Sequence, residues 1–142
     1  MNLFLKFIEV ILISVLISNK CQAQPPGWIT NASYYGEDYL GKPTANWREG
    51  WIFDPDKFTT ASWDYNFGDT LLVTNAVNGL KVFVIVIDRG PAERLYFDED
   101  VRLDLSRAAF DVIKGESREG RLRVYVEKVE EVETQIRVND GR

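Results

Sequence analysis

Apolar residues in this chain gather in short runs of strand length separated by polar turns, a pattern that predicts a protein built mainly from β-strands. Two neighbouring runs, Thr70–Asn75 and Lys81–Asp88, are joined by a turn at Asn78 and Gly79, which predicts a β-hairpin. The stretch Lys81–Ile87 is almost wholly apolar and β-branched, as in strands covered on both faces. We therefore expect this strand to be buried on both sides.

Alternation of apolar and polar residues predicts further strands towards the two ends of the chain. Trp28–Tyr35 is strand-like and is followed by Gly36, where the strand should end. In Arg121–Glu127 every second residue is apolar, so one face of this strand should be buried. A weaker strand signal lies at Ile136–Val138. Many short strands with long loops are typical of a small closed β-barrel.

Helix signals are sparse. One short helix is expected over Arg107–Ile113, with Ser106 as its N-cap and Gly115 as its stop. The segments Glu37–Trp51 and Arg89–Asp100 are predicted to be loops. At 142 residues the chain is long enough for one domain with a workable core. A closed barrel leaves no sheet edge for pairing with another copy, so we expect a monomer.

The first 23 residues have the layout of a secretory signal peptide. Lys6 gives a weak basic start, an apolar run extends from Phe7 to Ile17, and small residues end the segment at Cys21–Ala23. A membrane anchor and lipid attachment at Cys21 are the alternatives, but the apolar run is short for a span and contains Glu9. We expect a secreted or periplasmic protein with no stable membrane insertion after cleavage. The expected parts are a signal peptide at 1–23, the barrel domain at 24–129 and a charged tail at 130–142.

Charge and composition narrow the possible partners. The chain has a formal net charge of −5, no histidine, and Cys21 as its single cysteine. An acidic surface argues against nucleic acid as a partner. Because the domain after the leader has neither histidine nor cysteine, a zinc or thiol site is not expected. No loop has the spacing of a calcium site, so we expect no metal and no cofactor.

Several spaced motifs agree, in order, with those of one family of small barrels. They are ASYYG (Ala32–Gly36), GKPTAN (Gly41–Asn46), FDPDKFTTAS (Phe53–Ser62), FGDTLLVTN (Phe67–Asn75), NGLKVFVIVIDRGP (Asn78–Pro91) and LDLSRAAFDVI (Leu103–Ile113). Over Trp28–Glu127 the chain resembles the barrel domain of rare lipoprotein A (RlpA) and, more distantly, the first domain of expansins. The resemblance implies a mainly β fold, a six-stranded double-psi β-barrel with one or two short helices.

The resemblance also implies a class of activity. RlpA-like proteins act on bacterial cell-wall glycan, and some are lytic transglycosylases that cleave strands depleted of stem peptides and leave a 1,6-anhydro end. Expansins share the barrel and loosen walls without clear hydrolysis, and inverting endoglucanases on the same barrel use two aspartates. The implied partner is peptidoglycan or a related polysaccharide.

Asp88 and Asp104 match the two acidic positions of the family's groove, so they are the predicted catalytic residues. Cleavage of a glycosidic bond needs an acid and a second group that acts as base or nucleophile. Asp88 ends an apolar strand, which suits an acid, while the dipole of the following helix should favour the charged form of Asp104. In expansins and related endoglucanases, the aspartate that matches Asp104 is the essential or acidic one. The roles of acid and base therefore stay open. The alternative for Asp88 is a turn cap or a partner of Arg89 or Arg102, which we expect to brace the carboxylates.

Substrate contacts are expected from hydroxyl, aromatic and charged residues around these carboxylates. Ser33 matches a small hydroxyl position beside them, and Tyr34 or Tyr35 would supply a ring for the sugar, since flat rings stack on sugar faces. The alternative for the aromatics is that Trp28 and some tyrosines fill the core. The predicted substrate-binding set is Ser33, Tyr35, Trp47, Glu49, Trp51, Ser62, Trp63 and Arg89.

Two departures from the family pattern support a rival function. RlpA proteins usually have a histidine where Ser62 stands, and Gly-Glu directly after the motif that ends at Asn46; here Trp47–Trp51 intervenes and Glu49 is the match. The leading hypothesis is lytic cleavage by Asp88 and Asp104. The rival is a non-catalytic polysaccharide-binding or wall-loosening module, and a third class is a small protein-binding or inhibitor domain.

Overall fold

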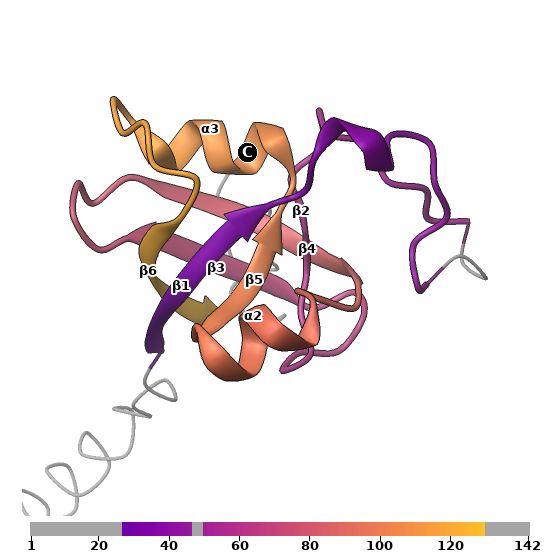
Figure 1. The fold of residues 1–142 in the computed structure, drawn as a ribbon, viewed down its shortest axis with the longest axis horizontal. Coiled ribbons are helices and arrows are strands. Elements are labelled where there is room, and N and C mark those ends of the chain that lie inside the picture. Colours follow the sequence, from indigo (N-terminus) through magenta and orange to yellow (C-terminus); the bar gives the residue numbers. More distant parts are fainter. Residues whose placement is uncertain (1–26, 47–49, 130–142) are drawn as a thin grey trace, which may run out of the picture.

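Six strands close into a barrel in the order β1-β5-β2-β4-β3-β6 (Figure 1). The computed structural model describes residues 27–46 and 50–129. The strands are β1 (Trp28–Tyr34), β2 (Thr59–Ala61), β3 (Thr70–Asn75), β4 (Lys81–Asp88), β5 (Val101–Leu105) and β6 (Leu122–Lys128). β1 pairs with β5, and β2 with β4, in parallel, whereas the other four junctions are antiparallel. The predicted mainly β, six-stranded barrel with short helices is therefore confirmed.

Aliphatic side chains that point inward from the strands fill the barrel. They are Ala32, Leu71, Val73, Val82, Val84, Val86, Leu103, Leu105, Leu122, Val124 and Val126, all at most 5% exposed. Because side chains alternate along a strand, the residues between them face outward. Asp104 stands between the inward-pointing Leu103 and Leu105, so the fold places its carboxyl on the outer face of the barrel.

Two short α-helices lie at opposite ends of the barrel, α2 (Glu93–Asp98) and α3 (Arg107–Lys114) (Figure 1). The Ser106 side chain accepts a hydrogen bond from the Ala109 N–H, and α3 ends at Gly115 with φ +59°, so the predicted cap and stop are confirmed. No helix within 27–46 and 50–129 is long and apolar enough to cross a bilayer.

The structure corrects one predicted burial pattern. β4 was expected to be covered on both faces, but Phe83 is 44% exposed and Ile85 40% exposed. Only one face of β4 lines the interior of the barrel, and its residues on that face are buried. The apolar run in this strand therefore does not mean that both of its faces are buried.

Two strands and one helix are absent from the sequence expectations. β2 has three residues, too few for alternation to be seen, and β5 carries Arg102 and Asp104 on its outer face. The segment predicted as the loop Arg89–Asp100 contains α2. The signal peptide, the strand signal at Ile136–Val138 and the charged tail lie outside the described residues.

Candidate functional site

β2 brings the two predicted catalytic residues to one place. Its last residue, Ala61, pairs with Asp88 of β4 on one side and with Asp104 of β5 on the other. Neighbouring strands lie about 4.8 Å apart, so the backbones of the two aspartates are roughly 10 Å apart across β2. Residues opposite one another in a sheet share a face. Both carboxyl groups therefore border the same strip of the barrel's outer face, where Ala61 between them is fully buried in a cluster with Tyr35 and Phe53.

The Asp88 carboxylate is held by three hydrogen-bond donors from separate segments. Oδ2 accepts from the Tyr35 hydroxyl at 2.8 Å, and Oδ1 accepts from the backbone N–H groups of Ala45 and Arg89, both at 2.8 Å. The bond from Ala45 fastens the loop after β1 to the end of β4. The orientation of this carboxylate is thus fixed before any ligand binds.

The Asp104 carboxyl is half-buried and has a different environment. Its Oδ1 accepts a hydrogen bond from the Ser33 hydroxyl at 2.9 Å. Burial raises the pKa of Asp104 to about 6; the bond from Ser33 lowers this pKa, and the charge of Asp88 raises it further. The group can therefore hold a proton in mildly acidic conditions.

This direction reverses the expectation for Asp104. The dipole of the following helix was predicted to favour the charged form, but burial favours the neutral form, and the carboxyl accepts its hydrogen bond from Ser33. Desolvation is the largest influence on this pKa, and it outweighs the opposing hydrogen bond from Ser33. Of the two carboxyl groups, Asp104 has the environment of a proton donor.

Tyr35 contributes its hydroxyl rather than its ring. The side chain is 8% exposed, and its ring packs against Phe53 and Tyr39 at centroid distances of 4.8 and 5.1 Å. Burial, together with the neighbouring charge of Asp88, raises the pKa of Tyr35 above its ordinary value, so the hydroxyl stays neutral and donates. The expectation that this ring stacks on a sugar does not fit its burial; Tyr35 positions Asp88.

The loop before β2 folds back over this strip of surface. It includes η2 (Glu37–Tyr39) and a bridge between Pro43 and Ile52. The Trp51 carbonyl accepts bonds from the backbone N–H and the hydroxyl of Thr44, next to Ala45, so the half-buried Trp51 is tied close to Asp88. Trp47 and Glu49 lie outside the described residues. Ala45 was missed as an Asp88 partner because a backbone donor has no side-chain signature, although it lies within the GKPTAN motif.

The side chains of Ser62 and Arg89 form their hydrogen bonds away from the two carboxylates, although the Arg89 backbone N–H donates to Asp88. Ser62 is fully buried; its hydroxyl donates to the Arg102 carbonyl at 3.4 Å and accepts from the Asp64 N–H at 3.2 Å. The Arg89 guanidinium donates to the carbonyls of Ser62 and Tyr65, at 2.8 and 2.6 Å. Both side chains are thus engaged in supporting the chain that follows β2.

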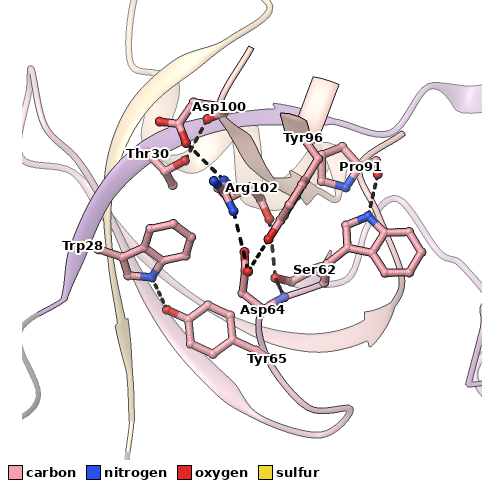
Figure 2. A network of polar contacts seen from close by, with 10 residues as sticks. Trp28, Thr30, Ser62, Asp64, Tyr65, Pro91, Tyr96, Asp100 and Arg102 are labelled. Atoms are coloured by element: carbon pink, nitrogen blue, oxygen red, sulfur yellow. Dashed lines mark hydrogen bonds and ion pairs between the residues drawn. The ribbon is translucent and has the colours of Figure 1, made fainter. Parts of the chain in front are cut away.

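The expectation that two arginine side chains brace the predicted catalytic carboxylates is wrong. The Arg89 side chain bonds to backbone carbonyls, as just described. Arg102 pairs with Asp100 at 3.1 Å and with Asp64 at 3.8 Å, which are different carboxylates at the α2 end of the barrel (Figure 2). Arg102 and Asp104 lie on the same outer face of β5. Arg102 is two residues further from α3, and there it pairs with Asp64 and Asp100.

Among the predicted substrate-binding aromatic residues that the structure describes, Trp63 is the most open to solvent. Its side chain is 48% exposed, and its indole N–H donates to the Pro91 carbonyl at 2.8 Å. Trp28, by contrast, packs partly buried against the core, as its alternative interpretation predicts.

Within the described ranges no three acidic, histidine or cysteine side chains gather into a metal-binding group.

Comparison with known proteins places these features in a family. The chain is 41% identical over 78 residues to the "Probable endolytic peptidoglycan transglycosylase RlpA" of Treponema pallidum (strain Nichols), covering 55% of this chain and 22% of that protein. It is 36% identical over 105 residues to the "Endolytic peptidoglycan transglycosylase RlpA" of Pseudomonas aeruginosa (strain UCBPP-PA14), covering 74% of this chain and 28% of the relative. The chain thus spans less than a third of the length of these relatives. No protein-family model matches it.

Solved structures agree on the fold. An expansin from Clavibacter michiganensis in its apo form superposes with a TM-score of 0.52 at 25% identity, covering 72% of this chain and 51% of the expansin. Cerato-platanin 3 from M. perniciosa has a TM-score of 0.54 at 12% identity, covering 76% of this chain and 99% of that chain, and supports the fold alone.

The closed barrel with two parallel strand pairs defines the class of this protein, a double-psi β-barrel. Within that class the chain is RlpA-like and, at greater distance, expansin-like, as its ordered motifs predict.

Proposed function

We propose that this protein acts on the glycan of the bacterial cell wall and cleaves it lytically, with Asp104 as proton donor and Asp88 as base. The observation that carries the proposal is the placement of two aspartates on either side of Ala61, one of them with a pKa raised to about 6. The names of the RlpA relatives, "endolytic peptidoglycan transglycosylase", support the substrate class.

The proposed step balances with these two groups alone. Protonated Asp104 gives its proton to the glycosidic oxygen as the bond from that oxygen to the sugar carbon breaks. The 6-hydroxyl of the same sugar attacks that carbon and loses its proton to Asp88, which forms a 1,6-anhydro end. Exchange with water then restores both carboxyl groups. Tyr35 and the backbone N–H groups of Ala45 and Arg89 hold Asp88 in place throughout.

The test is digestion of purified peptidoglycan, with and without stem peptides, by the purified protein, read by mass spectrometry. We expect anhydro-ended fragments from the wild type, and a loss of at least 100-fold in both Asp88→Asn and Asp104→Asn, the usual scale for an acid or base. Asp111→Asn is the matched control, because Asp111 lies on α3 and pairs with Lys114. Cleavage that persists unchanged in both site variants would contradict the assignment.

A second candidate function is a non-catalytic wall-binding or wall-loosening module. It is favoured by Ser62, which stands where relatives usually have histidine and which is buried with its hydroxyl already bonded. Retention on insoluble wall without released fragments, reduced in Trp51→Ala or Trp63→Ala, would support this function over cleavage.

Export belongs to the same proposal. Residues 1–23 are proposed to be a signal peptide that is removed, which leaves the barrel domain at 24–129 and the tail at 130–142. N-terminal sequencing of the protein recovered outside the cytoplasm should begin at Gln24. A start at Cys21 would indicate lipid attachment instead.

A further inference from the structure

An open hollow of about 320 Å³ lies where α2 meets the chain that follows β2. Four residues line it, Trp63 and, from α2, Glu93, Tyr96 and Phe97. The proposed chemistry uses none of them. Phe97 is 76% exposed and Trp63 48% exposed, which is a large aromatic surface to leave in water.

Two segments of the chain connect this hollow to the paired aspartates. The Ser62 N–H donates to the Asp88 carbonyl at 3.1 Å, and Trp63 is the next residue. Trp63 follows Ala61 by two residues, so their backbones are at most about 7 Å apart. From Asp88 the chain continues to Pro91, whose carbonyl accepts a bond from the Trp63 indole N–H at 2.8 Å. The hollow is therefore within reach of a polymer that is bound at the two aspartates.

The rings that line the hollow are held in place by internal contacts. The Phe97 ring stands edge-on to the Tyr96 ring, with their centroids 5.0 Å apart and their planes at 81°. The Tyr96 hydroxyl donates to Asp64 at 2.5 Å, and the Arg102 guanidinium lies over the Tyr96 ring, 4.0 Å from its centroid (Figure 2). An aromatic surface fixed in this way loses little freedom when a ligand binds.

These contacts also decide which chemistry the hollow offers. The polar hydrogens of Trp63 and Tyr96 are committed to Pro91 and Asp64. What remains is ring surface and the exposed carboxylate of Glu93, which is an acceptor. A purely apolar ligand would cover this carboxylate without pairing it, at a cost in free energy. A pyranose sugar has both features that the hollow calls for, a face of C–H groups for the rings and hydroxyl donors at its rim.

The charges around the hollow disfavour a ligand that carries a carboxyl group. Glu93 lies in its lining, and the chain has a formal net charge of −5. The neighbouring arginines are engaged elsewhere: Arg94 pairs with Glu99, and Arg102 pairs with two aspartates. An uncharged sugar is therefore the better match.

We propose that this hollow is a sugar subsite that holds an uncharged N-acetylhexosamine of the glycan strand in preference to a sugar with a carboxyl group. The apolar face of the sugar packs on Trp63 and Phe97, and a hydroxyl or amide N–H of the sugar donates to Glu93. The inference rests on the proposed function for the identity of the polymer. It deepens that function, because a strand that alternates uncharged and acidic sugars would be bound in one register.

The test uses the full chain and two monosaccharides, so that it does not depend on cleavage. The methyl glycosides of N-acetylglucosamine and N-acetylmuramic acid have the same ring, and the second adds a group that ends in a carboxylate. Each is titrated in at about pH 7, where a carboxyl group is ionised, and binding is followed by the NMR signal of the Trp63 indole N–H, assigned with Trp63→Phe. We expect a saturable shift at millimolar uncharged sugar, and at least fivefold weaker binding of the acidic one.

Variants separate the ring surface from the carboxylate. Phe97→Ala should weaken binding of the uncharged sugar at least threefold. Glu93→Gln keeps an acceptor but loses the charge, so it should bind the acidic sugar at least threefold more tightly than wild type does. Phe58→Ala and Glu116→Gln, an exposed ring and an exposed carboxylate that do not line the hollow, should change neither affinity. Equal binding of the two sugars by wild type, or an indole signal that does not shift, would overturn the assignment.

The two proposals can fail separately. The double variant Asp88→Asn, Asp104→Asn should bind the uncharged sugar as wild type does, because neither aspartate lines the hollow. Sugar binding at the hollow without glycan cleavage by wild type contradicts the proposed chemistry alone. Glycan cleavage without a shift of the Trp63 signal contradicts the subsite alone.

Discussion

Asp88 and Asp104 are the same kind of side chain in two different environments, and the proposed roles of base and acid rest on this difference. Asp88 accepts three hydrogen bonds, two of them from backbone N–H groups. Asp104 accepts one from Ser33 and is desolvated enough to raise its pKa to about 6. Groups of one type whose environments differ in this way can divide the roles of acid and base.

The raised pKa of Asp104 has a consequence for stability. Its folded value of about 6 lies above the ordinary 3.8, so the protonated form favours folding. This contribution is present in full below about pH 4 and is lost as the pH rises through about 6. Asp104→Asn removes the ionised form, so its unfolding free energy relative to wild type should increase between pH 4 and 7. The expected gain is on the order of 1–3 kcal/mol, from urea unfolding at both pH values.

Asp111→Asn provides a control of opposite sign. The bond from Lys114 lowers the pKa of Asp111, so this variant should lose stability at pH 7, with the difference fading as the pH falls through the folded pKa. If Asp104→Asn differs from wild type equally at pH 4 and 7, the raised pKa is wrong.

Among the elements, the short strand β2 and the start of α3 depend on one side chain. The Ser106 hydroxyl oxygen accepts bonds from the backbone N–H groups of Ala109 in α3 and Thr59 in β2, both at 3.3 Å. Ser106 is fully buried, so water cannot replace it. It therefore links α3 to β2, the strand that lies between the two aspartates.

Replacement of Ser106 by alanine should cost about 1–2 kcal/mol, because two buried donors lose their acceptor. Chemical denaturation should show a lower midpoint with an unchanged slope. Ser117→Ala is the matched control, since the Ser117 hydroxyl accepts only a local bond, from the Glu119 N–H in an exposed turn. Equal stability of Ser106→Ala and wild type would show that the cap does not stabilise the fold.

The sequence predicted some elements correctly and missed others. The boundaries of β3 and β4, and the cap and stop of α3, follow from local patterns and were predicted. β2 was not, because three residues carry no period and their conformation depends on the strands on either side. β5 was also not predicted, although its five residues alternate between buried apolar and charged outward positions.

In the molecule as a whole, closure of the barrel joins every strand to two neighbours, so the core should unfold as a unit. Leu71 on β3 is fully buried in this core and pairs with residues of β4 and β6. No strand edge remains on which part of the barrel could open by itself.

Leu71→Ala should lower the unfolding free energy by about 2–5 kcal/mol, because it leaves a cavity in the barrel. Unfolding should remain a single transition by circular dichroism and by tryptophan fluorescence. Val77→Ala, at a residue that is 87% exposed, should change stability by less than about 0.5 kcal/mol. Separate transitions for the two probes would mean that the barrel does not unfold cooperatively.

The sequence by itself determined the barrel class, most strand boundaries and the helix cap, and its motifs singled out the two aspartates as candidates, because alternation, turn residues and ordered motifs are local properties of the chain. Only the tertiary structure decided that Tyr35 turns its ring inward, that the side chains of Ser62 and Arg89 are engaged away from the carboxylates, and that the Asp104 carboxyl is desolvated. Ser33 and Asp104 are 71 positions apart in sequence, and Tyr35 and Asp88 are 53 apart. Contacts between such distant residues set burial and hydrogen bonding, and no local pattern of the chain encodes them.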